Sequence, residues 1–337
     1  MKRYLLSVIF LIIVISIYHF IDIRLFNLDL TKQIKNALFM IRTDPRVDPT
    51  VMVFSVGKLD PDQLESKIDS LLITEPEKIG VNLCHFDKIP RFLIYKYKSD
   101  NRVVFVNCED SKSGSLSQIL NNNGAVTHFR TDKEDYFEQT LTNFKGRGNN
   151  FERINYGTRL GYPINKGELN ESYAWFNPEQ LKGKTILLGY MGDYLTDSIY
   201  YYTSCRVTPL NSNYGESNIP PDMYDIELSA HILRTINEND FITEVNQIIR
   251  VLIILVFTLL NVSILTYAKT KWTIVNLIIA AILFIFLTGL GGFLMVLAFD
   301  HRYFLEMDEL PLILMITTFS TIVLNINNER ARAQQDT

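Results

Sequence analysis

The sequence predicts an α/β fold, with an extracytoplasmic domain built on a mainly parallel sheet flanked by helices, plus four transmembrane helices. Two observations lead to this prediction. Four long stretches contain no charged residue, one near the N-terminus and three near the C-terminus, and the polar segment between the first and the second is long enough to fold by itself. Within that segment, short apolar runs alternate with amphipathic stretches, as strands and helices do when they take turns along a chain.

Each charge-free stretch is long enough to cross a bilayer, which takes roughly 20 apolar residues within a range of about 17 to 25. The first stretch follows Lys2 and Arg3, as a signal peptide would, but no small-x-small cleavage site follows Phe20, so we expect an uncleaved anchor. Gly289, Gly291 and Gly292 in the third stretch either kink the helix or let a neighbour approach closely. The predicted division is a cytoplasmic N-terminus 1–3, transmembrane helix 4–21, extracytoplasmic domain 22–247, transmembrane helices 248–268, 272–299 and 310–326, and a cytoplasmic tail 327–337.

The distribution of Lys and Arg near the spans predicts the orientation. A protein with both ends in the cytoplasm places all three basic sites there and leaves the mostly acidic loop 300–309 on the other side, together with the large polar segment. Arg250, at the outer edge of the second span, does not fit, and we expect it to snorkel to the interface. The three basic sites are Lys2 with Arg3, Lys269 with Lys271, and Arg330 with Arg332.

Composition adds two constraints. A formal net charge of -4 provides no basic footprint for nucleic acid, and a mean hydropathy of +0.07 fits a membrane part averaged with a soluble domain. The three cysteines would face an oxidising compartment, where an odd number leaves at least one unpaired. Cys84 and Cys108 each end a predicted buried strand, so we expect core thiols, with a disulfide between them as the alternative.

The order of elements in the external domain can be followed from its apolar runs. A buried strand over 51–57 is followed by a helix that begins at Asp60, the expected N-cap, with Pro61 at its first position and apolar residues through Leu72. Strand, helix and strand at this spacing favour a right-handed parallel crossover. Further strands are predicted over 79–84, 102–107 and 184–189, then a long loop over 190–221 and a helix over 224–236.

The last part of this domain resembles a CHASE2 domain. The family has a strand of the type lkGK followed by apolar residues and Gly, then an Asp, a Thr-Pro pair, and a helix leading to the membrane after a pGvEiHA motif. The matching residues here are Leu181 to Gly189, Asp197, Thr208 with Pro209, and Asp225 to Leu233. The resemblance in plan covers the whole chain, because CHASE2 domains typically lie outside the cell between one helix and three following ones.

Two departures from that pattern limit what the resemblance implies. Asp225 stands where the family usually has Gly, and Ser229 where it usually has His, so a role of that His is not carried over. Family members typically continue into a kinase or cyclase, whereas this sequence ends at Thr337 without a cytoplasmic output domain. The resemblance therefore implies a sensory domain in a bacterial cytoplasmic membrane that acts through a separately encoded partner.

Few residues suggest chemistry. His85 and Asp87 follow the second predicted strand, at the edge of a parallel sheet where ligands tend to bind, although a polar pair at a strand end is usually just a solvated turn. Asp193 and Asp197, with Glu227, are candidates for binding a cation through oxygen ligands. The glycines after the fourth strand lack the Lys-Ser/Thr of a phosphate-binding loop. We therefore expect no catalytic residues, no metal centre and no cofactor.

The function expected from the sequence is that of a non-enzymatic, membrane-anchored recognition module. The external domain would recognise a ligand or a partner, and the helices would convey its state to another protein in the membrane or periplasm. The alternative is a structural, scaffolding subunit of a cell-envelope membrane complex. Nucleic acid is not expected as a partner in either case.

Overall fold

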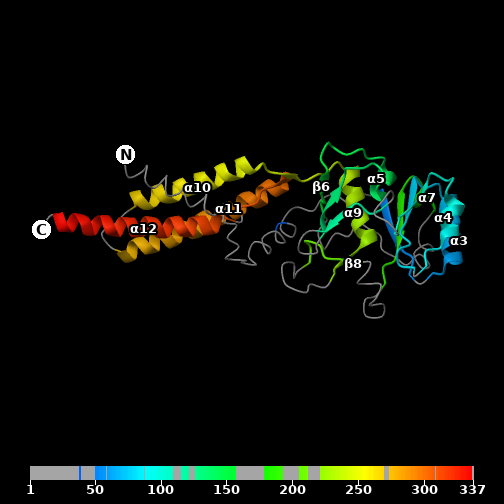
Figure 1. Ribbon diagram of the computed structural model, residues 1–337, viewed down its shortest axis with the longest axis horizontal. Helices are drawn as coiled ribbons and strands as arrows, with labels where there is room; N and C mark the ends of the chain where they lie inside the picture. The colour runs from blue at the N-terminus through cyan, green and yellow to red at the C-terminus, as the bar shows by residue number, and fades with distance from the viewer. Residues whose placement is uncertain are drawn as a thin grey trace. The chain divides into compact units, whose positions relative to one another are not determined.

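The computed structural model describes residues 38, 50–57, 59–86, 88–108, 115–120, 126–156, 178–192, 205–211, 221–268, 273–307 and 309–335. The chain divides into two compact units, one within Lys32–Thr243 and one that includes Glu244–Thr337 (Figure 1). The predicted first transmembrane helix, 4–21, lies outside the described residues.

A four-stranded parallel sheet forms the centre of the first unit. Its strand order is β1-β7-β2-β3, and every neighbouring pair is parallel. The predicted parallel sheet is therefore confirmed, while the insertion of β7 between β1 and β2 was not predicted. The four strands are β1 (Val51–Ser55), β2 (Lys78–Val81), β3 (Val103–Phe105) and β7 (Thr185–Gly189).

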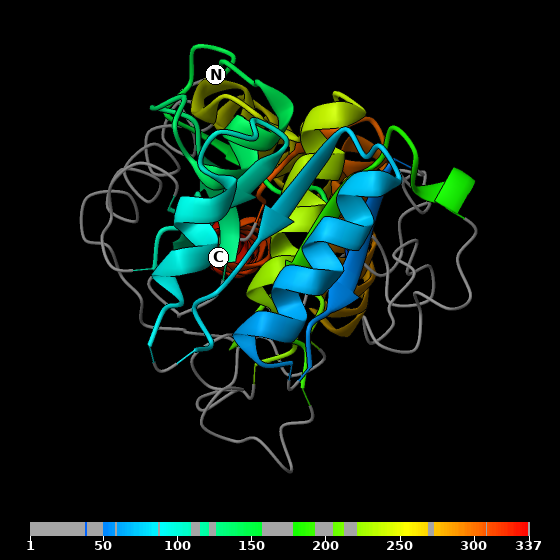
Figure 2. The ribbon, with the colours of Figure 1, turned by 90° about the vertical axis from the view of Figure 1, so that its right-hand side faces the viewer.

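Helices cover both faces of this sheet, which explains why β1 and β7 are buried along their whole length. α3 (Pro61–Ile73) and α4 (Arg91–Tyr97) pack on one face. α5 (Phe137–Thr142) and α9 (Asp225–Asn237) pack on the other. Figure 2 shows this layering, with α3 in blue in front of the strands and α9 in yellow-green behind them.

The predicted start of α3 is confirmed in detail. Asp60 Oδ1 accepts a hydrogen bond from the Gln63 backbone N at 2.8 Å, Gln63 Oε1 accepts one from the Asp60 N at 3.2 Å, and Pro61 occupies the first turn. This reciprocal capping box satisfies two backbone donors that the helix leaves open.

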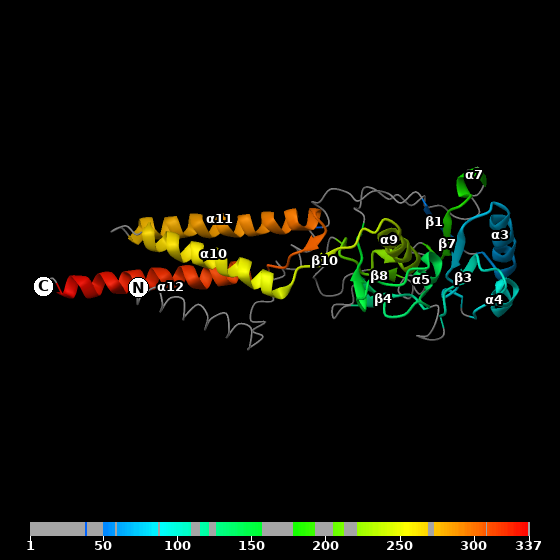
Figure 3. The same cartoon turned by 90° about the horizontal axis from the view of Figure 1, so that it is seen from above.

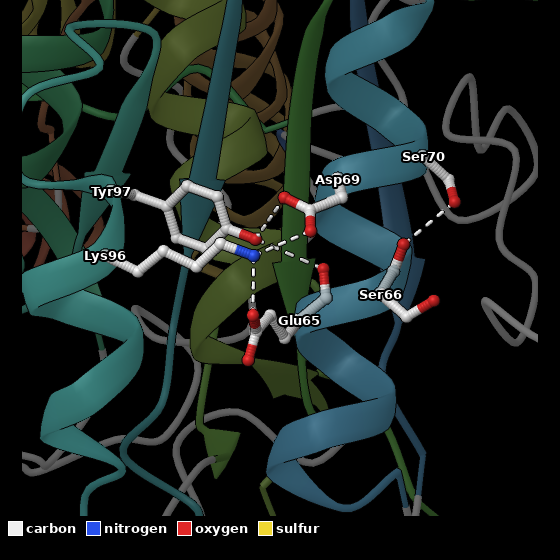
Figure 4. A network of polar contacts seen from close by, with 6 residues as sticks. All are labelled: Glu65, Ser66, Asp69, Ser70, Lys96 and Tyr97. Atoms are coloured by element: carbon white, nitrogen blue, oxygen red, sulfur yellow. Dashed lines mark hydrogen bonds and ion pairs between the residues drawn. The ribbon is translucent and has the colours of Figure 1, made fainter.

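A polar network joins α3 to α4 (Figure 4). Lys96 Nζ lies 2.5 Å from Glu65 Oε1 and 2.7 Å from Asp69 Oδ2, and the Tyr97 hydroxyl donates to Asp69 Oδ1 at 2.7 Å. Because the ring of Tyr97 is buried in the core while its hydroxyl reaches these carboxylates, the residue fixes α4 against α3.

Smaller sheets complete the first unit. β8 lies inside the region predicted as a continuous loop, 190–221, so that prediction was wrong at residues 205–206, where strand pairing with β9 intervenes. A three-stranded antiparallel sheet was not predicted either. The remaining elements are β4 (Gln118–Leu120), β5 (Val126–Arg130), β6 (Phe151–Arg153), α7 (Pro178–Leu181), β8 (Cys205–Arg206) and β9 (Met223–Tyr224).

The second unit contains three long helices that run along one another (Figure 3). Among the described residues, α10 and the Ile274–Asp300 part of α11 are long and apolar enough to cross a membrane, whereas the apolar part of α12, Leu310–Ile326, is shorter. α12 continues as helix to Gln335, through most of the predicted tail. The elements are β10 (Thr243–Glu244), α10 (Gln247–Tyr267), α11 (Thr273–Asp300), β11 (Tyr303–Phe304) and α12 (Leu310–Gln335).

Two contacts inside the helical unit concern residues singled out in the sequence. The Arg250 guanidinium lies 3.4 Å from Glu306 Oε2 and 3.7 Å from Glu309 Oε1, so the acidic loop supplies counter-charges for this residue. Gly291 lies where a Cβ would collide with the Leu310 side chain, and α11 is unbroken there. At this glycine the close-approach interpretation therefore holds rather than the kink.

Asn261 forms a polar contact between two helices of this unit. Its Nδ2 donates to Thr318 Oγ1 at 2.9 Å and to Thr317 Oγ1 at 3.2 Å, which joins α10 to α12.

Candidate functional site

β2 and β7 are neighbouring parallel strands, so their carboxyl ends lie side by side at one edge of the sheet. The helices that follow these two strands lie on opposite faces of the sheet. After β2 the chain leads to α4 on one face, and α9, which follows β7, packs on the other face. In open parallel sheets, ligands bind in the crevice outside the strand ends at such a reversal. Topology therefore places the candidate site here.

A shallow crevice occupies this position. It is too small to hold a water molecule, and it is lined by Asn82, His85, Tyr190, Asp225 and Ile226. The first two follow β2, Tyr190 follows β7, and the last two begin α9.

His85 is the aromatic centre of the crevice. Its ring lies 4.1 Å from that of Phe86 and is stacked 5.5 Å from that of Tyr190, centroid to centroid. Burial lowers the pKa of His85 to about 4, although the backbone of Asn82 opposes the shift in part. The imidazole is therefore neutral near pH 7 and can both donate and accept a hydrogen bond.

A disulfide lies beside this histidine. Cys84 and Cys108 are bonded, with their Cα atoms 5.3 Å apart, and the bridge ties the ends of the neighbouring strands β2 and β3. The expectation of core thiols at these two positions was wrong, and the alternative is observed. Strand adjacency is the reason, because β2 and β3 pair in parallel and their carboxyl ends bring the two side chains together.

Two glycines let α5 and α9 come close to the sheet. A Cβ on Gly80 of β2 would lie 2.7 Å from Phe137 Cζ, and a Cβ on Gly189 of β7 would lie 2.8 Å from Ile226 Cβ. Only glycine permits these approaches without displacement of the helices. Each helix carries a carboxylic residue next to its contact, and both carboxyl groups are consequently buried.

Glu138, on α5, is the more deeply buried of the two and is fully shielded from solvent. Its Oε1 accepts from the Ser229 hydroxyl at 2.7 Å, and its Oε2 accepts from the Ser117 backbone N at 3.0 Å. Within the described residues it has no cationic partner. Burial raises the pKa of Glu138, although the two hydrogen bonds favour the ionised form.

Asp225, the first residue of α9, is 5% exposed and binds Arg206 of β8 through two contacts. Arg206 Nη2 lies 3.1 Å from Oδ2, and Nε lies 3.0 Å from Oδ1. Burial nevertheless raises the pKa of Asp225 to about 7, because desolvation together with the nearby charge of Glu138 outweighs the attraction of the guanidinium.

Glu227 holds the start of α9. Its Oε2 accepts from the Tyr224 backbone N at 2.9 Å, three residues upstream, which satisfies a donor at the helix end. Cys205, on the adjacent β8, has a free buried thiol whose pKa is raised by burial and then by the charges of Glu227 and Asp225. A thiol in that state is a poor nucleophile.

Of the five residues proposed from the sequence, His85 lines the crevice and Glu227 caps the helix that borders it. Asp87, Asp193 and Asp197 lie outside the described residues. No group of three or more His, Cys, Asp or Glu side chains in the described ranges could hold a metal ion.

Sequence reasoning missed Glu138, Asp225 and Arg206 as site residues. Asp225 was noticed only as a departure from the CHASE2 pattern, which is the one signal that pointed to it. Ser229, the second departure, is the partner of Glu138. Comparisons with known proteins add nothing further: no family model matches the chain, and no curated protein or solved structure matches it either.

Proposed function

We propose that the chain is a membrane-anchored sensory module. Its α/β unit recognises a stimulus outside the cytoplasm, and its apolar helices pass the resulting state to a separately encoded partner. The main support for this proposal is the position of α9 between the crevice and the apolar helices in the sequence. The helix begins at the crevice, is buried from Asp225 to Thr235, and ends at Asn237, with only residues 238–246 between it and α10.

The last turn of α9 is anchored as firmly as its first. Arg234 Nη2 donates to the Asn155 carbonyl, and the Thr235 hydroxyl accepts from the Asn155 backbone N at 3.2 Å. Both contacts are buried, so a change at the crevice end of α9 reaches its other end through one rigid element rather than through a loop.

Two further points support an external, membrane-bound location. Disulfides persist in oxidising compartments and are rare in the cytosol, and the Cys84 to Cys108 bridge fits a domain on the outer side of a bacterial cytoplasmic membrane. The resemblance of the sequence to CHASE2 domains supports the same arrangement, with one helix before the domain and three after it.

A scaffolding role in an envelope complex is the second candidate, and one surface favours it. Phe92 and Tyr95 on α4 are 44% and 70% exposed, and Arg91 and Lys98 are exposed beside them. Aromatic residues and Arg are enriched at protein interfaces.

Hydrogen exchange on the full chain in lipid nanodiscs distinguishes the two roles. Ile226→Ala loosens the crevice end of α9, and Leu64→Ala, in the core under α3, is the matched control. A sensory module should show faster exchange in α9 and a changed pattern in α10 for Ile226→Ala only. If both variants leave 247–268 unchanged although each lowers the stability of the α/β unit, the proposed coupling is wrong.

A further inference from the structure

We propose that Glu138 and Asp225 together form a proton-binding site, through which the α/β unit responds to the acidity of the compartment that it faces. The use of this signal by the membrane helices rests on the proposed sensory function. Proton binding itself does not, because it follows from the contacts within the first unit.

Around Asp225, buried carboxyl groups outnumber the cations that contact them in the part of the chain that the structure describes. Glu138 and Asp225 are 0% and 5% exposed, and among the described residues Arg206 is the cation that contacts the pair, through Asp225. An ionised carboxylate buried without a cation is penalised by several kcal/mol unless it takes up a proton. Glu138 and Asp225, two buried carboxyl groups beside one guanidinium, are therefore expected to retain a proton near neutral pH.

Within the described ranges, the elements packed around the pair contribute both neutral and titratable groups. β4 and the residue before it contribute two neutral donors. The Gln118 side chain donates to the Asp225 backbone carbonyl at 3.1 Å, and the Ser117 backbone N–H donates to Glu138. Arg234 lies on α9 but engages Asn155 and Asp240. The remaining titratable groups nearby are His231 and Glu227 on α9, Cys205 on β8, Asp222 and Tyr224 around β9, and His85 and Tyr190 at the strand ends.

Glu138 connects three elements through its two oxygens, since Ser229 belongs to α9 and Ser117 precedes β4. In protonated Glu138 these contacts are weaker, but the residue then adds no charge beside Asp225. When both groups ionise, two negative charges face one guanidinium, and α5 and α9 repel each other at the place where the glycines hold them close to the sheet. Rising pH should therefore loosen the first turn of α9.

The direction follows from the pKa shifts. Both carboxyl groups have folded-state pKa values raised above their ordinary values of 4.5 and 3.8, and that of Asp225 is about 7. The stability contributed by the bound proton is thus fully present below about pH 4 and is lost as the pH rises through about 7. For one site of this kind, raising the pH from 6 to 8 increases the unfolding equilibrium constant about 10-fold.

The test is the pH dependence of local opening in the full chain, in nanodiscs between pH 5.5 and 8.5. Hydrogen exchange is corrected for its intrinsic pH dependence and followed in α9. Wild type should show about a 10-fold increase in the opening equilibrium between pH 6 and 8. Asp225→Asn and Glu138→Gln should flatten this response, and Glu77→Gln, an exposed carboxylate on the same unit, should retain it.

Ser229→Ala keeps the proposal testable if either carboxyl variant fails to fold. It removes a hydrogen bond that favours ionised Glu138, so the midpoint of the response should move to higher pH. A flat wild-type response, or an unchanged midpoint in Ser229→Ala, would overturn the proton site. A normal response in α9 with no change in α10 to α12 would uphold the proton site and refute the sensory function instead.

Discussion

Removal of the disulfide should cost the α/β unit a large part of its stability. The bridge joins cysteines 24 positions apart, so it closes a loop of 25 residues. The loop-entropy relation, 2.1 + 1.5R ln 25 in cal/mol/K, gives about 3.5 kcal/mol at 25 °C, within the usual range of about 2 to 4 kcal/mol. With a denaturant slope of about 1 to 3 kcal/mol/M, the urea midpoint should fall by about 1 M or more.

Pulse proteolysis of the full chain in urea measures this midpoint for the α/β unit. The cleanest comparison is wild type with and without a reductant, because no side chain changes, and the Cys84→Ser, Cys108→Ser double variant should match the reduced protein. An unchanged midpoint, with mass spectrometry showing both thiols free, would refute the reasoning. Alkylation of membranes without a reductant should label Cys205 alone after unfolding, and labelling of three thiols would exclude the bridge in the cell.

Three further predictions concern packing and polar contacts. Gly80→Ala should lower the free energy of unfolding, measured from the urea midpoint, by about 1 to 3 kcal/mol, because the new Cβ would lie within 3 Å of Phe137, Leu141 and Leu187. A neutral effect would mean that α5 moves freely. Tyr97→Phe should cost about 1 kcal/mol in the same assay through its hydroxyl contacts (Figure 4), whereas Lys96→Met, at a solvent-exposed position, should change little; equal losses would contradict this ranking. Asn261→Leu should weaken the helical unit by about 0.6 kcal/mol, up to about 1.7, in SDS unfolding, and a gain in stability would show that the amide contacts carry no net benefit.

The local elements of the central sheet could be predicted because their signals are short-range. The apolar run at 51–55 and the capping residues Asp60 and Pro61 act within a few positions of where they stand, and β1 and α3 begin where they indicate. Strand order depends on contacts distant in sequence, so the place of β7 between β1 and β2 could not be read from the apolar runs.

The same limitation explains what the sequence did not reveal about the site. Cys84 and Cys108 pair because β2 and β3 are neighbours, which becomes evident only once the strand order is known. Glu138 and Asp225 are residue types that usually lie at the surface, and nothing in their own segments marks them as buried. They are buried where α5 and α9 pack closely over Gly80 and Gly189, on strands more than 30 positions away in the chain.

The contact of Asn261 with Thr317 and Thr318 has a consequence for how the helical unit can move. A helix rises about 1.5 Å per residue, so a slide of α10 along α12 by even one position would break hydrogen bonds of 2.9 and 3.2 Å. In a lipid environment no water is present to replace them. The contacts thus favour one axial register, and they are kept when α10 moves together with α12 as one piece or tilts about this polar contact.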